Sequence, residues 1–325
     1  MMLLPDRVIK AAILGSTAGL PAAWRLALRA RWLARHELGK VRRAGLVIIG
    51  HPKSGNTWLK AMLSRIYQVR HGLPPSRLIG SDELALRHSA IPRLAATNAW
   101  YSYEGAVGRA LDASGGDPAL RRKPTVVLVR HPCDIAVSWY FQFTRRQSAT
   151  KQELISHAIA HPIDRRTISM WDFVRHSDIG LPSLIDYLNL WARRSQGLER
   201  ALLVRYEDLR AEPGVWLRRI GELMGESFEA AEIEEAVRFA SFENLRRLET
   251  QGFFRQGGFR LVDRRDPASL KTRRGKVGGY RDYFSSAQVQ ELEALVEAKL
   301  SPALGYRREA SAPLETPRPA DSQGA

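Results

Sequence analysis

Cysteine is nearly absent from this chain of 325 residues, in which Cys133 is the only one. A single cysteine cannot form a disulfide within the chain, and it cannot build a cysteine-rich zinc module. Proteins without disulfides are typical of a reducing compartment, so we expect a cytoplasmic protein. Because 44% of the residues are hydrophobic, a chain of this length can instead bury a sizeable core.

A long hydrophobic run is also absent. The uncharged stretch near the N-terminus covers residues 11–24 and is interrupted by Pro21, whereas a membrane-spanning helix needs about 20 apolar residues. Arginines follow this stretch, where a signal peptide would have a cleavage site with small residues. We therefore expect neither a membrane span nor a signal peptide here.

The N-terminal segment, residues 1–44, is instead basic and amphipathic. Trp24, Leu28 and Trp32 are spaced four apart and so share one face of a helix. A basic amphipathic helix either packs on a globular domain or lies on an anionic membrane surface. The sequence leaves both alternatives open, and peripheral membrane contact through this segment is one of them.

Acidic residues are fewer than basic ones. The chain has 34 Asp and Glu and 50 Lys and Arg, which gives a formal net charge of +16. This surplus favours anionic partners such as a phosphorylated nucleotide, an acidic sugar, nucleic acid or an anionic membrane. The basic residues are spread through the chain rather than gathered in a stripe with aromatic residues, so we expect no nucleic-acid partner. A non-enzymatic binder of nucleic acid or membrane is kept as an alternative.

Three short apolar runs predict buried strands at residues 46–50, 125–129 and 201–204. Segments with helical apolar spacing lie between them, which predicts an α/β fold with a parallel β-sheet flanked by helices on both faces. We expect one domain at residues 45–305 and a disordered tail, rich in Pro, Ala and Ser, at residues 306–325. Residues 252–282 form a long loop without periodicity, and long loops in compact domains are often functional.

The stretch GHPKSGNTW lies where the first strand gives way to a helix. Backbone N–H groups and the dipole at a helix N-terminus attract anions. Gly55 allows a phosphate to approach the backbone closely, and Lys53 adds a cation. Ser54, Asn56 and Thr57 add side-chain donors. This loop is therefore predicted to bind phosphate.

The loop differs from a Walker A motif, which reads G-x-x-x-x-G-K-[ST]. Gly50, Gly55 and Thr57 have the Walker spacing, but Asn56 stands at the lysine position. The sequence also contains no clear strand ending in an aspartate suited to Mg²⁺. A P-loop kinase using ATP and Mg²⁺ is therefore an alternative, and no metal is expected.

Five blocks of the sequence resemble, in order, those of the sulfotransferases that use 3′-phosphoadenosine-5′-phosphosulfate (PAPS). They are HPKSGNTW, VLVRHPCDIAVSWYF, VRYEDLRAEP, SFENL and RRGKVGGY. The family's phosphosulfate loop usually reads YPKSGTTW and its last block RKGxxGDW. The resemblance covers roughly residues 45–300 and implies a P-loop-like nucleotide-binding sulfotransferase fold.

The resemblance implies a role for each matching residue. Arg130 and Ser138 would bind the 3′-phosphate, Tyr206 would contact the nucleotide, and Phe242 would pack on adenine with Trp58. The C-terminal block would add Arg273, Arg274 and Gly275 at the 3′-phosphate. Lys53 would stabilise the leaving 5′-phosphate as the sulfuryl group passes to a hydroxyl or amine and PAP is released.

The acceptor and the general base are less well marked. Family members usually use a histidine between the first two blocks, which leaves His71 and His88. We predict His88, because it follows a short apolar stretch that could be a strand ending at the site, and a histidine needs little pKa tuning for this task. The family's usual KTH context is absent, however. Residues 99–121 resemble an insertion that belongs to the acceptor pocket, and the acceptor class (small molecule, sugar or lipid) stays open.

Overall fold

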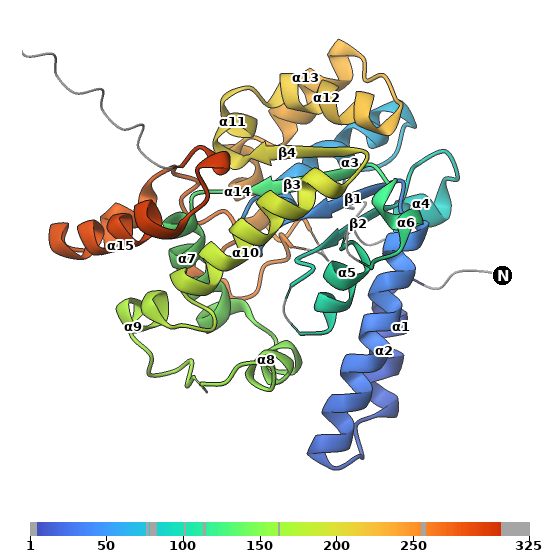
Figure 1. Ribbon diagram of the computed structural model, residues 1–325. Coiled ribbons are helices and arrows are strands. Elements are labelled where there is room, and N and C mark those ends of the chain that lie inside the picture. The colour runs from blue at the N-terminus through green and yellow to red at the C-terminus, as the bar shows by residue number, and fades with distance from the viewer. Residues whose placement is uncertain are drawn as a thin grey trace, which may run out of the picture.

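The structure is a computed structural model that describes residues 5–75, 78, 83–100, 102–112, 115–161, 163–254 and 258–306. Its centre is a parallel sheet of four strands in the order β2-β1-β3-β4. The strands are β1 (Leu46–Ile49), β2 (Leu94–Thr97), β3 (Thr125–Val129) and β4 (Ala201–Arg205). The α/β fold with a parallel sheet is confirmed (Figure 1).

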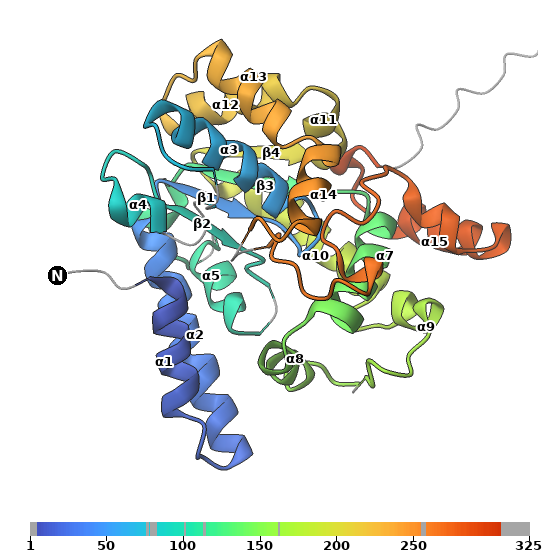
Figure 2. The ribbon, with the colours of Figure 1, turned by 180° about the vertical axis from the view of Figure 1, so that it is seen from behind.

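Helices cover both faces of the sheet. α10 crosses the face seen in Figure 1, and α3 covers the opposite face, seen in Figure 2. The helices that follow the N-terminal pair are α3 (Asn56–Arg70), α4 (Glu83–Arg87), α5 (Gly105–Ala110), α6 (Pro118–Arg121), α7 (Pro132–Phe141), α8 (Ala149–Ser156), α9 (Met170–Arg175), α10 (Leu181–Arg194), α11 (Tyr206–Ala211), α12 (Pro213–Met224), α13 (Ala230–Phe239), α14 (Phe242–Thr250) and α15 (Ser286–Lys299).

The alternation of side chains along the strands explains the two faces. Val47 and Ile49 of β1 join the hydrophobic core that includes α7 and α10. Leu46 and Ile48 point the other way and pack in the core with α3 and α13. All four are fully buried, as a strand in the middle of a parallel sheet requires.

The segment before β2 differs from the expectation. The apolar stretch that precedes His88 was expected as a strand, but residues 83–87 form the short helix α4. The edge strand follows at residues 94–97, where Leu94 pairs with Leu46 and Thr97 with Ile49. A run of four residues, two of them alanine, has little intrinsic preference for a strand. Pairing with β1 therefore determines that this segment is a strand.

The N-terminal segment forms a helical hairpin of α1 (Asp6–Ser16) and α2 (Ala22–Arg43) that projects from the sheet (Figures 1 and 2). Arg25 and Arg29 of α2 form ion pairs with Glu153 of α8. Leu26 and Leu33 pack against Leu154 of the same helix. α2 also packs against the turn Ser102–Glu104 and against α5 (Gly105–Ala110), so the hairpin is attached to the domain along α2 as well as through α8. Residues 307–325 of the expected tail lie outside the described residues.

Candidate active site

The carboxyl ends of the four parallel strands meet at one edge of the sheet, where ligands of α/β folds usually bind. A cavity of about 530 Å³ opens at this edge. It is lined by Gly50 after β1, Thr97 at the end of β2, Arg130 after β3 and Tyr206 after β4. The sheet therefore brings four distant parts of the sequence to one place.

The loop after β1 approaches the cavity with its backbone in unusual conformations. Lys53 has a φ of 85° and Gly55 a φ of 110°, and such strained residues cluster at ligand-binding sites. A Cβ at Gly55 would lie 2.8 Å from a ring carbon of Tyr206, so only glycine fits. Asn56 closes the loop by donating a hydrogen bond from Nδ2 to the Gly50 oxygen at 2.9 Å. The sequence thus folds into a cradle at the N-terminus of α3.

Arg130 is fixed at the end of β3 by Asp134, which lies in the first turn of α7. The Arg130 Nη2 atom lies 3.3 Å from Asp134 Oδ2, and the guanidinium stacks 4.4 Å from the centre of the Tyr206 ring. Asp134 also accepts hydrogen bonds from the backbone N–H groups of Gly278 at 2.9 Å and Tyr280 at 3.1 Å. One carboxylate therefore joins the arginine to the C-terminal loop.

The C-terminal loop closes the cavity opposite the phosphate loop. Arg273 lies with its guanidinium carbon 4.0 Å from the centre of the Phe141 ring and is bonded to the Tyr283 hydroxyl. Arg274 pairs with Asp282 at 2.7 Å. Gly275, with a φ of 60°, is pressed against the Phe242 ring, which a Cβ would approach to 2.5 Å. The two arginines and the aromatic ring thus share one wall of the cavity.

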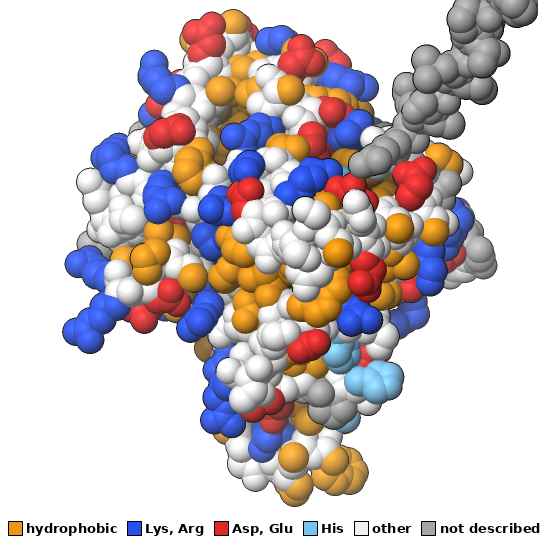
Figure 3. Space-filling view, turned by 90° about the vertical axis from the view of Figure 1, so that its left-hand side faces the viewer, with side chains coloured by type: hydrophobic (Ala, Val, Ile, Leu, Met, Phe, Trp, Pro, Cys, Tyr) orange, Lys and Arg blue, Asp and Glu red, His pale blue; other side chains and the backbone are white. Residues whose placement is uncertain are grey.

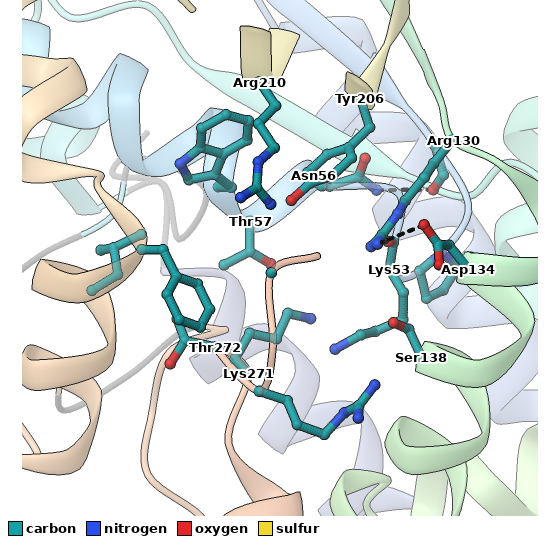
Figure 4. A pocket seen from close by; sticks show the side chains of 18 of the residues that line it. Lys53, Asn56, Thr57, Arg130, Asp134, Ser138, Tyr206, Arg210, Lys271 and Thr272 are labelled. Carbon is teal, nitrogen blue, oxygen red and sulfur yellow. Dashed lines mark hydrogen bonds and ion pairs between the residues drawn. The ribbon is translucent and has the colours of Figure 1, made fainter. Parts of the chain in front are cut away.

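Most residues expected at the site line this single cavity (Figure 4). They are Lys53, Gly55, Asn56, Thr57, Trp58, Arg130, Ser138, Tyr206, Phe242, Arg273, Arg274 and Gly275. Ser54 is expected there too, but its side chain is fully buried and does not line the cavity. Trp58 is oriented by its Nε1, which donates to the Ala240 oxygen at 2.8 Å.

The structure does not bring His88 to the cavity. Its ring lies 4.2 Å from that of His71, centre to centre, and His71 caps the C-terminal end of α3. Because α3 starts at the phosphate loop and rises about 1.5 Å per residue, His88 lies at the opposite edge of the sheet, roughly 20 Å away. No histidine of the described residues lines the cavity.

The cavity instead contains a carboxylate that sequence reasoning missed. Glu104, at the end of the turn Ser102–Glu104, accepts hydrogen bonds through Oε2 from the Thr97 hydroxyl at 3.1 Å and the Asn98 backbone at 2.7 Å. Its Oε1 lies 3.6 Å from Nζ of Lys151. Glu104 belongs to the expected insertion 99–121, but no local pattern distinguishes it from other surface glutamates.

Several lysines lie close together in the cavity, and their charges lower one another's pKa. Burial lowers the pKa of Lys53 well below its usual value, and the nearby Lys271 and Arg146 lower it further. Burial and then Arg146 and Lys60 lower the pKa of Lys271 to about 7. For Lys60, burial and the cations of the hairpin lower the pKa to about 8. A cavity that accumulates positive charge in this way is built for an anion.

No group of acidic, histidine or cysteine side chains suited to a metal ion is present among the described residues. The donor set of the cavity, rich in arginine and lysine, fits phosphate and sulfate groups rather than a cation.

Comparison with known proteins agrees with this chemistry. The family model of the sulfotransferase domain matches residues 44–303. Cytosolic sulfotransferase 13 of Arabidopsis thaliana is 27% identical over 280 residues, which cover 80% of this chain and 78% of the relative. Flavonol 4′-sulfotransferase of Flaveria chlorifolia is 29% identical over 119 residues, which cover 35% of this chain and 36% of the relative.

A solved structure shares the fold. It is retinol dehydratase in complex with androsterone and the inactive cofactor PAP, with a TM-score of 0.50 and 17% identity, covering 82% of each chain. The family match extends over the sheet, the phosphate loop and the C-terminal loop. This chain therefore belongs to the sulfotransferase-domain family.

Proposed function

We propose that this sulfotransferase transfers the sulfuryl group of PAPS to a hydroxyl or amine of an acceptor and releases PAP. The observation that carries the proposal is the convergence of the phosphate loop, Arg130 and the loop 273–275 on one cavity. A nucleotide with phosphates at its 3′ and 5′ positions needs cations at two separate places. Arg130 and Lys53 supply one each.

The donor would lie across the cavity with adenine between Trp58 and Phe242, since aromatic rings hold a base by stacking. Arg130, Ser138 and the arginines of the C-terminal loop would bind the 3′-phosphate. The backbone N–H groups at the start of α3 would bind the 5′-phosphate.

In the transfer step, the acceptor oxygen forms a bond to sulfur as the bond from sulfur to the 5′-phosphate oxygen breaks. Lys53 faces the leaving phosphate and neutralises the charge that builds on it. The acceptor proton needs a base, and Glu104 is the carboxylate that lines the cavity beyond Lys53 and Asn98. We therefore propose Glu104, in place of His88, as the proton acceptor.

The size of the cavity supports a small-molecule acceptor. The cavity is a pocket of about 530 Å³, and this volume suits a compact ligand beside the nucleotide. The Flaveria relative is named for a flavonol, and by analogy we propose a hydroxyl-bearing small molecule for this chain. Sugars and lipid head groups of similar size are the other candidates.

We further propose a cytoplasmic protein with a domain at residues 45–305 that touches membranes through the hairpin. Hydrophobic side chains gather at the end of the hairpin, the lowest point of Figure 3, with basic side chains above them. Trp24 is 68% exposed there. Within the described part of the chain, no helix is long and apolar enough to span a membrane.

Nucleotide preference tests the proposed function. We expect calorimetric titration to show PAP binding well ahead of AMP, and ahead of ATP with Mg²⁺. Arg130→Ala should weaken PAP binding about tenfold or more and remove the preference over AMP, because the 3′-phosphate loses its fixed cation. Arg122→Ala, an exposed arginine paired with Glu199, is the matched control. Preference for ATP with Mg²⁺ would instead identify a kinase.

A further inference from the structure

The cavity contains more cations than the nucleotide donor requires. Lys53, Arg130, Arg273 and Arg274 face the positions proposed for the two phosphate ends. Besides Lys276, which is paired with Asp282, three further lysines line the same cavity, and they are Lys60, Lys151 and Lys271. The proposed function leaves these three without a role, so their placement is informative about the acceptor.

The three lysines come from different elements and converge. Lys60 follows Asn56 by one turn of α3, so it lies beside the phosphate loop on the same helix face. Lys271 precedes the arginine pair of the C-terminal loop by two residues, and Figure 4 shows its side chain reaching into the same space as Lys53. Lys151 enters from α8. The pKa of Lys271 is lowered by the charges of both Lys60 and Lys151, as expected of neighbours.

Nearby carboxylates balance this charge only in part. Asp6 and Glu37 of the hairpin lie near Lys60 but form ion pairs with Lys10, His36 and Lys40, and Glu249 beside Lys271 pairs with Arg146. Glu104 pairs with Lys151 at 3.6 Å, and Asp134 is occupied by Arg130. Among the residues that the structure describes, no ion pair forms at the ammonium group of Lys60 or Lys271. Two ammonium groups in a partly enclosed space lose protons readily in the empty site, as the lowered pKa values of Lys60 and Lys271 indicate, and an anionic ligand favours their protonated forms.

We propose that the acceptor carries an anionic group, a carboxylate, phosphate or sulfate, which binds between Lys60 and Lys271. Its nucleophilic hydroxyl then faces Glu104 and the sulfuryl group held at Lys53. This inference rests on the proposed function and narrows it from small molecules in general to anionic ones. The pocket selects for charge, because only an anionic acceptor supplies a counter-ion that favours the protonated form of both lysines.

Matched acceptors, one with an anionic group and one without, test the inference. The first pair is 4-hydroxyphenylacetate and 4-ethylphenol, and the second is glucose 6-phosphate and glucose. Each is titrated by calorimetry into protein saturated with PAP, and turnover with PAPS is then compared. We expect the anionic member of at least one pair to bind about tenfold or more tightly than its neutral partner.

The variants Lys271→Gln and Lys60→Gln should each remove this preference while PAP still binds. Lys299→Gln, an exposed lysine at the end of α15, is the matched control and should keep it. Equal binding within both pairs, no binding of either anionic member, or a preference that survives both substitutions would overturn the inference. If turnover of neutral and anionic acceptors falls equally in Lys271→Gln, this lysine serves the sulfuryl group and the inference is also wrong.

If the wild-type protein does not bind PAP, the result bears on the donor site and not on the acceptor. It would contradict the proposed donor site itself, whereas intact PAP binding with no preference for anions contradicts only the acceptor class.

Discussion

At the scale of single residues, Asp134 shows how one buried carboxylate organises the donor end of the cavity. It is 3% exposed, and it contacts Arg130 with one oxygen while accepting backbone hydrogen bonds from Gly278 and Tyr280. Charge-assisted hydrogen bonds of this kind are stronger than neutral ones. Arg130 therefore has a fixed orientation before any ligand arrives, which reduces the entropy that binding must overcome.

Glu104 is the residue whose substitution best separates binding from chemistry. We expect Glu104→Gln to lower kcat about 100-fold or more, because the amide keeps the shape of the side chain but cannot take a proton. PAP affinity should hardly change, since Glu104 lies beyond the proposed phosphate positions. Steady-state rates with PAPS, measured beside PAP titrations, check both expectations.

His88→Ala serves as the comparison for this prediction. Because His88 packs against His71 at the far edge of the sheet, we expect kcat within about twofold of wild type. A large loss in His88→Ala with normal turnover in Glu104→Gln would reverse our assignment of the base.

The residues that sequence could predict are those that immediately follow a strand or sit beside a glycine. Lys53, Arg130 and Gly275 belong to short sequence motifs, and their spacing within these motifs predicts where they lie relative to the strands and loops. Glu104 and Lys151 have no such motif, since a long connection and a separate helix bring them to the cavity. His88 was misplaced for the same reason, because the edge strand that positions this region is four residues long and weakly marked.

At the scale of elements, the junction of β1 with α3 depends on a glycine. Gly55→Ala should destabilise the protein by about 1–3 kcal/mol and abolish most PAP binding. The substituted Cβ has both an unfavourable φ of 110° and a contact of 2.8 Å with Tyr206. Chemical denaturation and PAP titration measure the two effects.

Gly72→Ala is the matched control for that glycine. It follows the other end of α3 with a φ of 62°, and a Cβ there meets nothing within 4 Å. We expect a loss of about 1 kcal/mol from backbone strain alone, with PAP affinity retained. Equal loss of PAP affinity in both variants would show that stability, and not the shape of the loop, explains the effect.

The hairpin is the element for which we predict a membrane contact. Trp24→Ser should lower association with vesicles containing anionic lipid about thirtyfold, because burying a large apolar side chain contributes about 2 kcal/mol. Val215→Ser, an exposed apolar residue of α12 with 38% exposure at the other end of the molecule (Figure 1), is the control. Sedimentation with vesicles measures the binding, and unchanged sedimentation of Trp24→Ser would rule out the contact.

At the scale of the whole molecule, which has a net charge of +16, the lysines of the cavity make the stability depend on pH. Lysines there have pKa values below the ordinary 10.5, about 7 for Lys271 and about 8 for Lys60. Between these values and 10.5, the unfolded chain binds more protons than the folded chain. These groups therefore make the free energy of unfolding rise as the pH increases from about 7 to about 10.

Anionic ligands should reverse this effect, because they favour the protonated ammonium groups. We expect PAP binding at pH about 8.5 to take up protons through Lys53, whose pKa is lowered by burial and by neighbouring cations. Binding should therefore weaken as the pH rises, while the ligand-free protein becomes more stable. Calorimetry in buffers of different ionisation enthalpy measures the uptake, and Lys53→Met should reduce it. Identical enthalpies in all buffers would contradict this prediction, because they would show that PAP binding takes up no proton.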